Sequence, residues 1–270
     1  EIAAGTAIYV VVDGVYAGYI RLTDQLKPGA AEAIARLRSL GVKETVMLTG
    51  DREAAAAPAA KEAGVSRLNL SLDTLDSQKY VHITRNGSLD DFWKGFHAAL
   101  DAGFRKIKLN AVLIGGFNDD EILPLAQLTR QYPVDMRFIE MMPMCDSSGF
   151  GPEAYIPFTR VLEALPEAVP AAKDGGVAKL FHLTGALGNI GLISPVSAHF
   201  CGECNRIRLT ADGKVKPCLH SNAEYPLKGL DFDGMKAQLE AAILGKPQWH
   251  GDLDAAHKSG AGRNMNQIGG

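Results

Sequence analysis

DFWKGFHAALDAGFRKIKLNAVLIGGFNDDEILPLAQLTRQYPVDMRFIE, residues 91–140, alternates between a helical and a strand-like spacing of its apolar side chains. The pattern predicts a helix over Asp91–Ala102, a strand over Lys106–Ile114, a helix over Asp119–Arg130 and a strand over Met136–Glu140. Strands that alternate with helices of this length are typical of parallel βα units. The sequence therefore predicts an α/β protein.

The same alternation continues toward the amino end of the chain. In such folds, functional side chains lie at the carboxyl ends of the parallel strands, so we expect a site there. The expected elements are strands at Tyr9–Asp13 and Gly18–Leu22 around the Asp13-Gly14 turn, a helix at Ala30–Leu40, a strand at Thr45–Leu48, an alanine-rich helix at Glu53–Ala63 and a strand at Arg67–Leu72.

Beyond Gly149 the composition changes to proline, glycine and short apolar runs. A tail over Lys258–Gly270 has no periodicity. We therefore predict three parts: residues 1–64, 65–148 and 149–270. The elements expected in the third part are strands at Lys179–Leu183, Asn189–Ser194 and Arg206–Thr210, and a helix near Gly234–Leu244.

Composition restricts the partners of the chain. Its 270 residues are 46% hydrophobic and 22% charged, which is ordinary for a globular protein. The net charge of -3 favours neither nucleic acid nor an anionic membrane surface. No apolar run approaches the roughly 20 residues that span a bilayer, so we expect no membrane partner and a cytoplasmic location.

Three of the four cysteines lie within eighteen residues of one another, Cys201, Cys204 and Cys218. A hairpin around Asp212-Gly213 would return Cys218 toward the Cys201-Gly-Glu-Cys204 turn, so that the sulfur atoms converge. Three thiolates leave one iron of a 4Fe-4S cluster without a protein ligand. A zinc site completed by His199 or His220 has compatible spacing, and spacing alone leaves both metals open.

A resemblance favours iron and sulfur. The run from His199 to Leu219, HFCGECNRIRLTADGKVKPCL, closely resembles the second-cluster motif of the GTP 3',8-cyclases, the molybdenum cofactor biosynthesis protein A family of radical S-adenosylmethionine (SAM) enzymes. The resemblance covers about residues 63–270. Its other motifs are Arg67–Asp76, RLNLSLDTLD; Lys106–Asn110, KIKLN; Arg137–Pro143, RFIEMMP; and the terminal Ile268-Gly269-Gly270.

This resemblance implies an incomplete TIM-type barrel, a carboxy-terminal iron-sulfur layer and two 4Fe-4S clusters. It implies that Cys201, Cys204 and Cys218 are the metal ligands of the second cluster. It further implies that Ser71 and Met142 contact SAM, that Lys108, Arg206, Ile207 and Arg208 contact GTP, and that Arg206, Arg208, Gly269 and Gly270 serve catalysis.

The reaction implied by the family begins with reductive cleavage of SAM to a 5'-deoxyadenosyl radical. That radical takes a hydrogen atom from C3' of GTP, and the carbon radical attacks C8 of guanine. The implied partners are GTP, SAM, a second copy of the chain, and a pathway enzyme that converts the cyclised GTP to cyclic pyranopterin.

Two features depart from the family pattern. The first cluster of the family requires a Cys-x3-Cys-x2-Cys motif, and the sequence has no cysteine before Cys145. We therefore expect that this chain alone does not generate the radical. Cys145 itself lies between Met144 and Asp146 and is left without a role.

The second departure is at the amino end. Residues 5–64 resemble part of the phosphorylation domain of a metal-transporting P-type ATPase, without its phosphorylated aspartate motif or its membrane helices. The resemblance implies a βα segment of different origin, with Thr49 and Asp51 as remnants of a phosphate site. The matching residues are Asp13-Gly14, Gly18, Asp24, Lys27-Pro28 and Val46–Asp51.

The leading hypothesis is thus a GTP 3',8-cyclase-type enzyme of molybdenum cofactor biosynthesis that lacks the ligands of its first cluster. Two alternatives remain open on the sequence: an inactive remnant that binds GTP or zinc, and a phosphate-handling fragment related to P-type ATPases.

Overall fold

The computed structural model describes residues 6–22, 27–49, 60–61, 64–85, 87–143, 150–251, 253 and 259–263. The chain divides into two compact units. Unit 1 comprises residues 1–111, 121–137 and 182–190, and unit 2 comprises residues 112–120, 138–181 and 191–270.

The main sheet has seven strands in the order β3-β4-β5-β6-β9-β8-β7. Strand β3 pairs in parallel with β4, and β4 pairs in parallel with β5. The protein is therefore mixed α/β with parallel pairing in the part predicted to form βα units. The strands are β3 (Val46–Thr49), β4 (Arg67–Ser71), β5 (Ile107–Leu113), β6 (Val134–Glu140), β7 (Val169–Pro170), β8 (Lys179–His182) and β9 (Ile190–Ile193).

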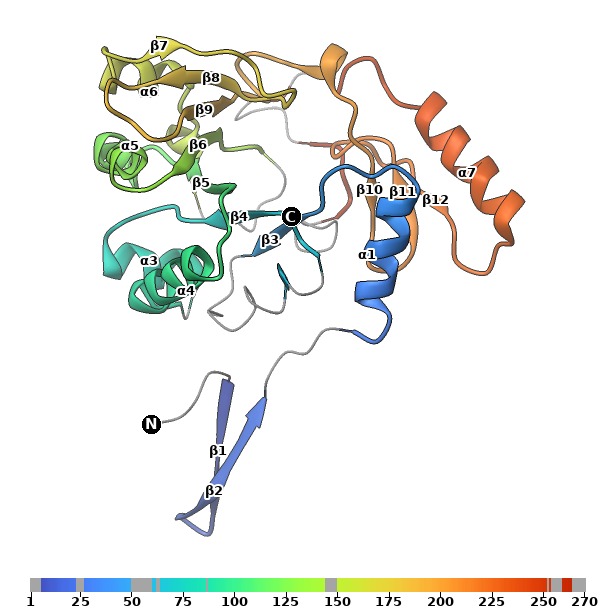
Figure 1. Ribbon diagram of the computed structural model, residues 1–270, viewed down its shortest axis with the longest axis horizontal. Coiled ribbons are helices and arrows are strands. Elements are labelled where there is room, and N and C mark those ends of the chain that lie inside the picture. Colours follow the sequence, from blue (N-terminus) through green and yellow to red (C-terminus); the bar gives the residue numbers. More distant parts are fainter. Residues whose placement is uncertain are drawn as a thin grey trace. The chain divides into compact units, whose positions relative to one another are not determined.

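In unit 1, helices α4 (Leu89–Asp101) and α5 (Ile122–Gln131) lie beside β4 and β5 (Figure 1). Helix α4 begins at Ser88, whose side chain accepts a hydrogen bond from the Asp91 amide. The apolar side chains between these helices and the strands are buried, as the helical and strand spacing predicts. They include Leu109, Ala111, Leu125, Ala126 and Met136.

The amino-terminal elements of unit 1 follow the expected order. Strands β1 (Thr6–Val12) and β2 (Val15–Leu22) form an antiparallel hairpin, and helix α1 (Ala30–Ser39) comes next. One further helix, α3 (Ser77–Thr84), was not predicted from the sequence. Its first turn is held by the Asp76 side chain, which accepts hydrogen bonds from the Gln78 and Lys79 amides.

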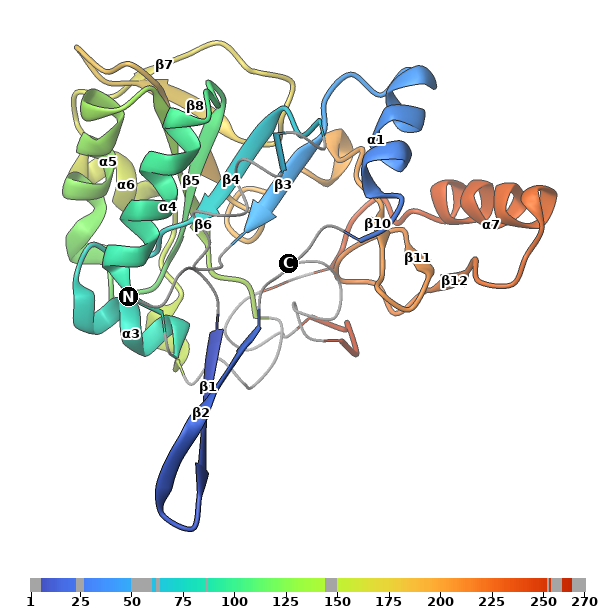
Figure 2. The same ribbon diagram turned by 60° about the horizontal axis from the view of Figure 1, so that its bottom comes forward.

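Unit 2 contains a second, small sheet of three antiparallel strands, which lies beside helix α7 in both views (Figure 2). The turn between its first two strands has Gly213 at a φ of 83°, a conformation that favours glycine. The elements of this unit outside the main sheet are η3 (Pro152–Ala154), α6 (Thr159–Ala164), η4 (Cys201–Glu203), β10 (Arg208–Leu209), β11 (Lys214–Lys216), β12 (Tyr225–Pro226) and α7 (Phe232–Leu244).

The main difference from the sequence-based expectation is strand β10. We predicted a strand over Arg206–Thr210, but it spans only Arg208–Leu209. The Arg206 carbonyl accepts a hydrogen bond from the Lys246 side chain, so this part of the backbone is bonded outside the strand ladder. Most of the expected Glu53–Ala63 helix lies outside the described residues. Among the described helices, none is long and apolar enough to cross a membrane.

Candidate iron-sulfur and GTP site

The cysteine motif lies in unit 2 on a tight turn. Helix η4 begins at Cys201, and the Cys204 amide donates a hydrogen bond to the Cys201 carbonyl over 3.1 Å. Cys218 follows β11, the strand paired with β10. All three are half-buried free thiols. The predicted hairpin thus returns the chain toward the turn.

Lys246, just after α7, connects the two arms that carry these cysteines. Its ammonium group donates to the carbonyl oxygens of Arg206, at 2.7 Å, and Pro217, at 2.9 Å. These carbonyls lie two residues after Cys204 and one residue before Cys218, respectively. Because one side chain bonds both arms, Lys246 fixes their separation.

Arg208 lies on the hairpin between Cys204 and Cys218 and interacts electrostatically with both thiols. Burial and the neighbouring Arg206 lower the pKa of Arg208, whereas Cys218 and Cys204 raise it. In the hairpin register, Arg208 pairs with Lys216, which lies two residues before Cys218. Arg208 is half-buried, while Arg206 and Ile207 are exposed. A guanidinium group in this position can bind phosphate or the edge of a guanine base.

Three histidines pack near the cysteine motif. The His250 ring lies 4.8 Å from both the His199 and the His220 ring centroids. Burial, with the neighbouring His250 and Arg208, lowers the pKa of His220 from 6.5 to about 4, so His220 is neutral at pH 7. His220 Nδ1 lies 2.9 Å from Ser259 Oγ.

The three thiols do not form a closed metal site among the described residues. Within the described ranges there is no group of three or more histidine, cysteine, aspartate or glutamate side chains placed to hold a metal ion. The three sulfur atoms therefore do not converge to ligating positions as expected. His199 and His220 likewise do not complete a zinc site with them. By donor chemistry, three free thiols still suit an iron-sulfur cluster.

Ser71 and Lys108 lie in unit 1 on neighbouring strands. Ser71 ends β4 and is exposed, and it pairs in register with Asn110 of β5. Lys108 is 5% exposed, with its ammonium 3.9 Å from Asp135 Oδ2. Because the carboxyl ends of parallel strands form one edge, Ser71 occupies the position where βα folds place functional groups.

The segment after Ser71 is fixed by Glu121, for which the sequence predicted no role. Its carboxylate accepts hydrogen bonds from Thr74 Oγ1 and the Leu75 amide, both at 2.6 Å, and from the Lys79 ammonium at 3.0 Å. Thr74 is fully buried and Glu121 is 8% exposed. The Ser-Leu-Asp-Thr turn is therefore rigidly held.

Glu140 is a second residue without a predicted role, although it lies in the quoted RFIEMMP motif. Its carboxylate, 3% exposed, accepts hydrogen bonds from the amides of Phe158, Val196 and Ser197 over 2.9–3.1 Å, and from the Ser197 hydroxyl. These contacts fix the loop that leads into the cysteine motif. A carboxylate at the end of an apolar strand was the only signal in the sequence.

Met142 is half-buried in unit 2, just after β6. Gly269, Gly270, Cys145 and Asp51 lie outside the described residues, as does the side chain of Thr49. The structure thus places Cys204, Cys218 and Arg208 on one turn and the hairpin that follows it in unit 2, and holds Ser71 and Lys108 on adjacent strands of unit 1.

Two protein-family models match this chain. The radical SAM superfamily model matches residues 18–129, and the Molybdenum Cofactor Synthesis C model matches residues 134–251. A GTP 3',8-cyclase of Alkaliphilus oremlandii is 41% identical over 253 residues, which cover 91% of this chain and 78% of that protein. The chain belongs to the GTP 3',8-cyclase family.

Other members of the family align over still more of the chain. The GTP 3',8-cyclase of Pelotomaculum thermopropionicum is 40% identical over 93% of this chain and 81% of that protein. The one from Moorella thermoacetica is 39% identical over 100% of this chain and 84% of that protein.

These matches correct the interpretation of the amino-terminal segment. The radical SAM match begins at residue 18, inside the stretch that resembles a P-type ATPase, and the Moorella protein aligns over the whole chain. The ATPase resemblance therefore has no support, and the comparisons favour neither alternative function. The predicted boundaries after residues 64 and 148 stay predictions.

Proposed function

We propose that this protein binds GTP and serves molybdenum cofactor biosynthesis as a GTP 3',8-cyclase-type protein of the radical SAM family that lacks the cysteines of its first cluster. Its family membership supports the reaction class. The observation that carries the proposal for the site is the register of the cysteine hairpin: Arg208, four residues after Cys204, pairs with Lys216, two residues before Cys218. A cation next to metal-binding thiols suits an anionic nucleotide that is bound at the metal.

In this proposal Cys201, Cys204 and Cys218 hold a 4Fe-4S cluster. Three free thiols on one turn and one strand end, connected through Lys246, support it. With three protein ligands, such a cluster supplies one iron that can bind a substrate atom. The parallel strands would form an incomplete barrel, and the cysteine motif would belong to a carboxy-terminal layer.

The remaining roles are assigned to the chain's own residues. Arg206, Ile207 and Arg208 would contact GTP, and a GTP contact is also assigned to Lys108, whose buried ammonium lies 3.9 Å from Asp135 Oδ2. Ser71 and Met142 would contact SAM. The Gly269-Gly270 tail would approach the substrate, because glycine has no side chain to clash. We further propose a homodimer, and a pathway enzyme that receives the cyclised GTP.

The proposal also limits the chemistry of residues 1–270. The stretch matched by the radical SAM model, residues 18–129, contains no cysteine. Without three upstream thiolates this chain does not supply the ligands of a first cluster. We therefore expect no 5'-deoxyadenosine from the chain with SAM, GTP and a reductant; its formation would contradict this part of the proposal.

GTP binding tests the proposal without requiring turnover. We expect isothermal titration of the anaerobically purified chain to show GTP binding that Arg208→Met weakens by roughly tenfold or more, since a charge-assisted hydrogen bond is lost. Arg160→Met, which removes a surface guanidinium paired with Glu163, should bind GTP like the wild type. Absence of GTP binding, or equal loss in both variants, would contradict the proposal.

A further inference from the structure

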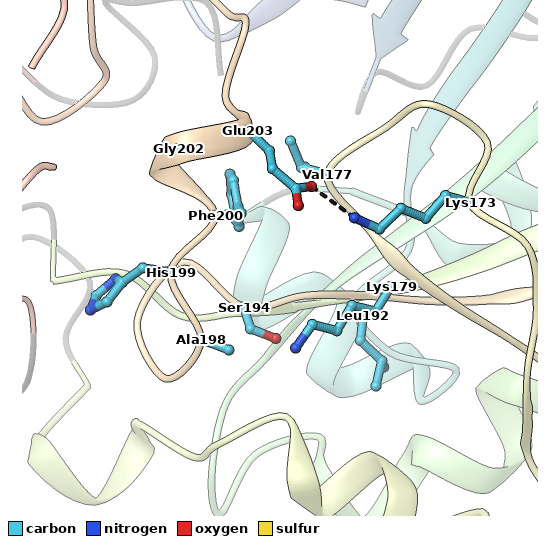
Figure 3. Close-up of a pocket in the computed structure, with 10 residues that line it drawn as sticks. All are labelled: Lys173, Val177, Lys179, Leu192, Ser194, Ala198, His199, Phe200, Gly202 and Glu203. Carbon is cyan, nitrogen blue, oxygen red and sulfur yellow. Dashed lines mark hydrogen bonds and ion pairs between the residues drawn. The ribbon is translucent and has the colours of Figure 1, made fainter. Parts of the chain in front are cut away.

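A pocket of about 310 Å³ lies in unit 2, with residues on both sides of Cys201 in its wall. Apart from the neighbours of Cys201, the lining residues come from strands β8 and β9, from the loop before β8 and from the loop after β9. None of the lining residues is assigned to GTP, SAM or the cluster above. They are Lys173, Val177, Lys179, Leu192, Ser194, Ala198, His199, Phe200, Gly202 and Glu203 (Figure 3). We call this cavity the Lys179 pocket.

Ser194 provides the first sign of a ligand. Its residue is 3% exposed, and its hydroxyl has no hydrogen-bond partner among the described residues. A buried hydroxyl without a partner is unfavourable, because it has lost its bonds to water without replacement. Since Ser194 lines the pocket, a bound molecule can supply the missing partner.

The charges in the pocket are unequally compensated. Lys173 forms an ion pair with Glu203 over 2.8 Å. Lys179, by contrast, has no carboxylate partner within the part of the chain that the structure describes; its ammonium lies 5.3 Å from the centroid of the Phe158 ring. The Lys179 end of the pocket is therefore positive, while the Lys173 end is neutralised.

We propose that the Lys179 pocket binds a small anion, through a phosphate or carboxylate group that pairs with Lys179 and accepts a hydrogen bond from Ser194. Figure 3 shows the Lys179 side chain extending toward Ser194, and the Lys173–Glu203 pair on the opposite side. Phe200 adds an apolar wall. The volume lies at the lower end of small-molecule sites, which begin at roughly 300 Å³.

Titration calorimetry with inorganic phosphate, and separately with acetate, tests this site. We expect saturable binding of one anion per chain, which Lys179→Gln and Ser194→Ala each weaken by roughly tenfold or more. Lys179→Arg retains the charge and should retain most of the binding. The two titrations distinguish a phosphate from a carboxylate ligand, and binding of either supports the proposal.

Lys228→Gln is the matched control, because Lys228 is an exposed lysine on a different loop. It should leave anion binding unchanged, and circular dichroism should show that each variant is folded. No saturable binding of either anion, or wild-type affinity in Lys179→Gln, would overturn the proposal. The proposal for the Lys179 pocket does not rest on the proposed function. Lys179→Gln should bind GTP like the wild type, whether or not Arg208→Met weakens GTP binding.

Discussion

Glu140 shows how one buried carboxylate determines the course of a loop near a site. Its oxygens accept hydrogen bonds from the amides of Phe158, Val196 and Ser197. The same loop carries the Pro195 carbonyl, which lies within hydrogen-bond distance of His199 Nδ1 and His250 Nε2. Glu140 therefore acts on the cysteine motif through the backbone that precedes it.

We expect Glu140→Ala to lower the free energy of unfolding by about 3 kcal/mol, because several buried donors lose their acceptor at once. Glu140→Gln keeps one acceptor oxygen and should lose less. Urea denaturation of both variants measures the difference. Equal stability of Glu140→Ala and the wild type would show that water replaces the carboxylate without cost.

A second prediction concerns Glu224 and acid. The Arg263 guanidinium hydrogen-bonds its carboxylate and lowers the pKa of Glu224 from 4.5 to about 2. A folded-state pKa below the unfolded value means that the contribution to stability is present above pH 4.5 and disappears as the pH falls toward 2.

Arg263→Met should return the pKa of Glu224 toward 4.5, so the variant should be less stable than the wild type near pH 7 and should lose less stability as the pH falls from 4.5 toward 2. Urea midpoints measured as a function of pH test this. Arg105→Met, at an exposed residue in unit 1, is the control. Identical pH profiles for Arg263→Met and the wild type would contradict the role given to Arg263.

Individual site residues were predictable only where a motif named them. Cys201, Cys204, Cys218 and Arg208 come from one turn and one hairpin, which local spacing predicts, but the three cysteines do not form a metal-binding group among the described residues. Glu121 and Glu140 were missed because their partners, such as Leu75 and Ser197, are 46 and 57 residues away in the chain. Only the folded chain brings such groups into contact.

At the level of elements, apolar periodicity predicted α4, α5 and the strands β4, β5 and β6 within two or three residues at each end. These elements bury one face, which the spacing of their side chains reveals. Helix α3 was missed because it buries only Tyr80 and depends on the Asp76 cap for its start. Strand β10 was predicted too long because the sequence cannot show the contact of Lys246 with Arg206.

The Lys246 contact gives a prediction at this scale. Lys246→Met removes both hydrogen bonds that connect the arms bearing Cys204 and Cys218. We expect anaerobically reconstituted Lys246→Met to retain less iron per chain than the wild type, because the thiols are less well positioned. Lys236→Met on α7, where the lysine is exposed, is the matched control. Equal iron content in both variants would contradict the positioning role.

At the scale of the whole molecule, two family models match successive parts of one chain, and relatives align over nearly all of it. The family was predictable because several motifs occur in the right order. The ATPase resemblance of the amino-terminal segment has no support, because it rested on short matches such as Val46–Asp51. Local similarity of a strand and a glycine turn recurs in unrelated α/β proteins.

The most direct test of the account is the metal content of the chain. Anaerobic purification and reconstitution should give about four iron and four labile sulfide per chain, with no more than one cluster, and the triple variant of Cys201, Cys204 and Cys218 to serine should bind none. Zinc bound in stoichiometric amount without labile sulfide would contradict the account, as would full iron and sulfide content in the triple variant.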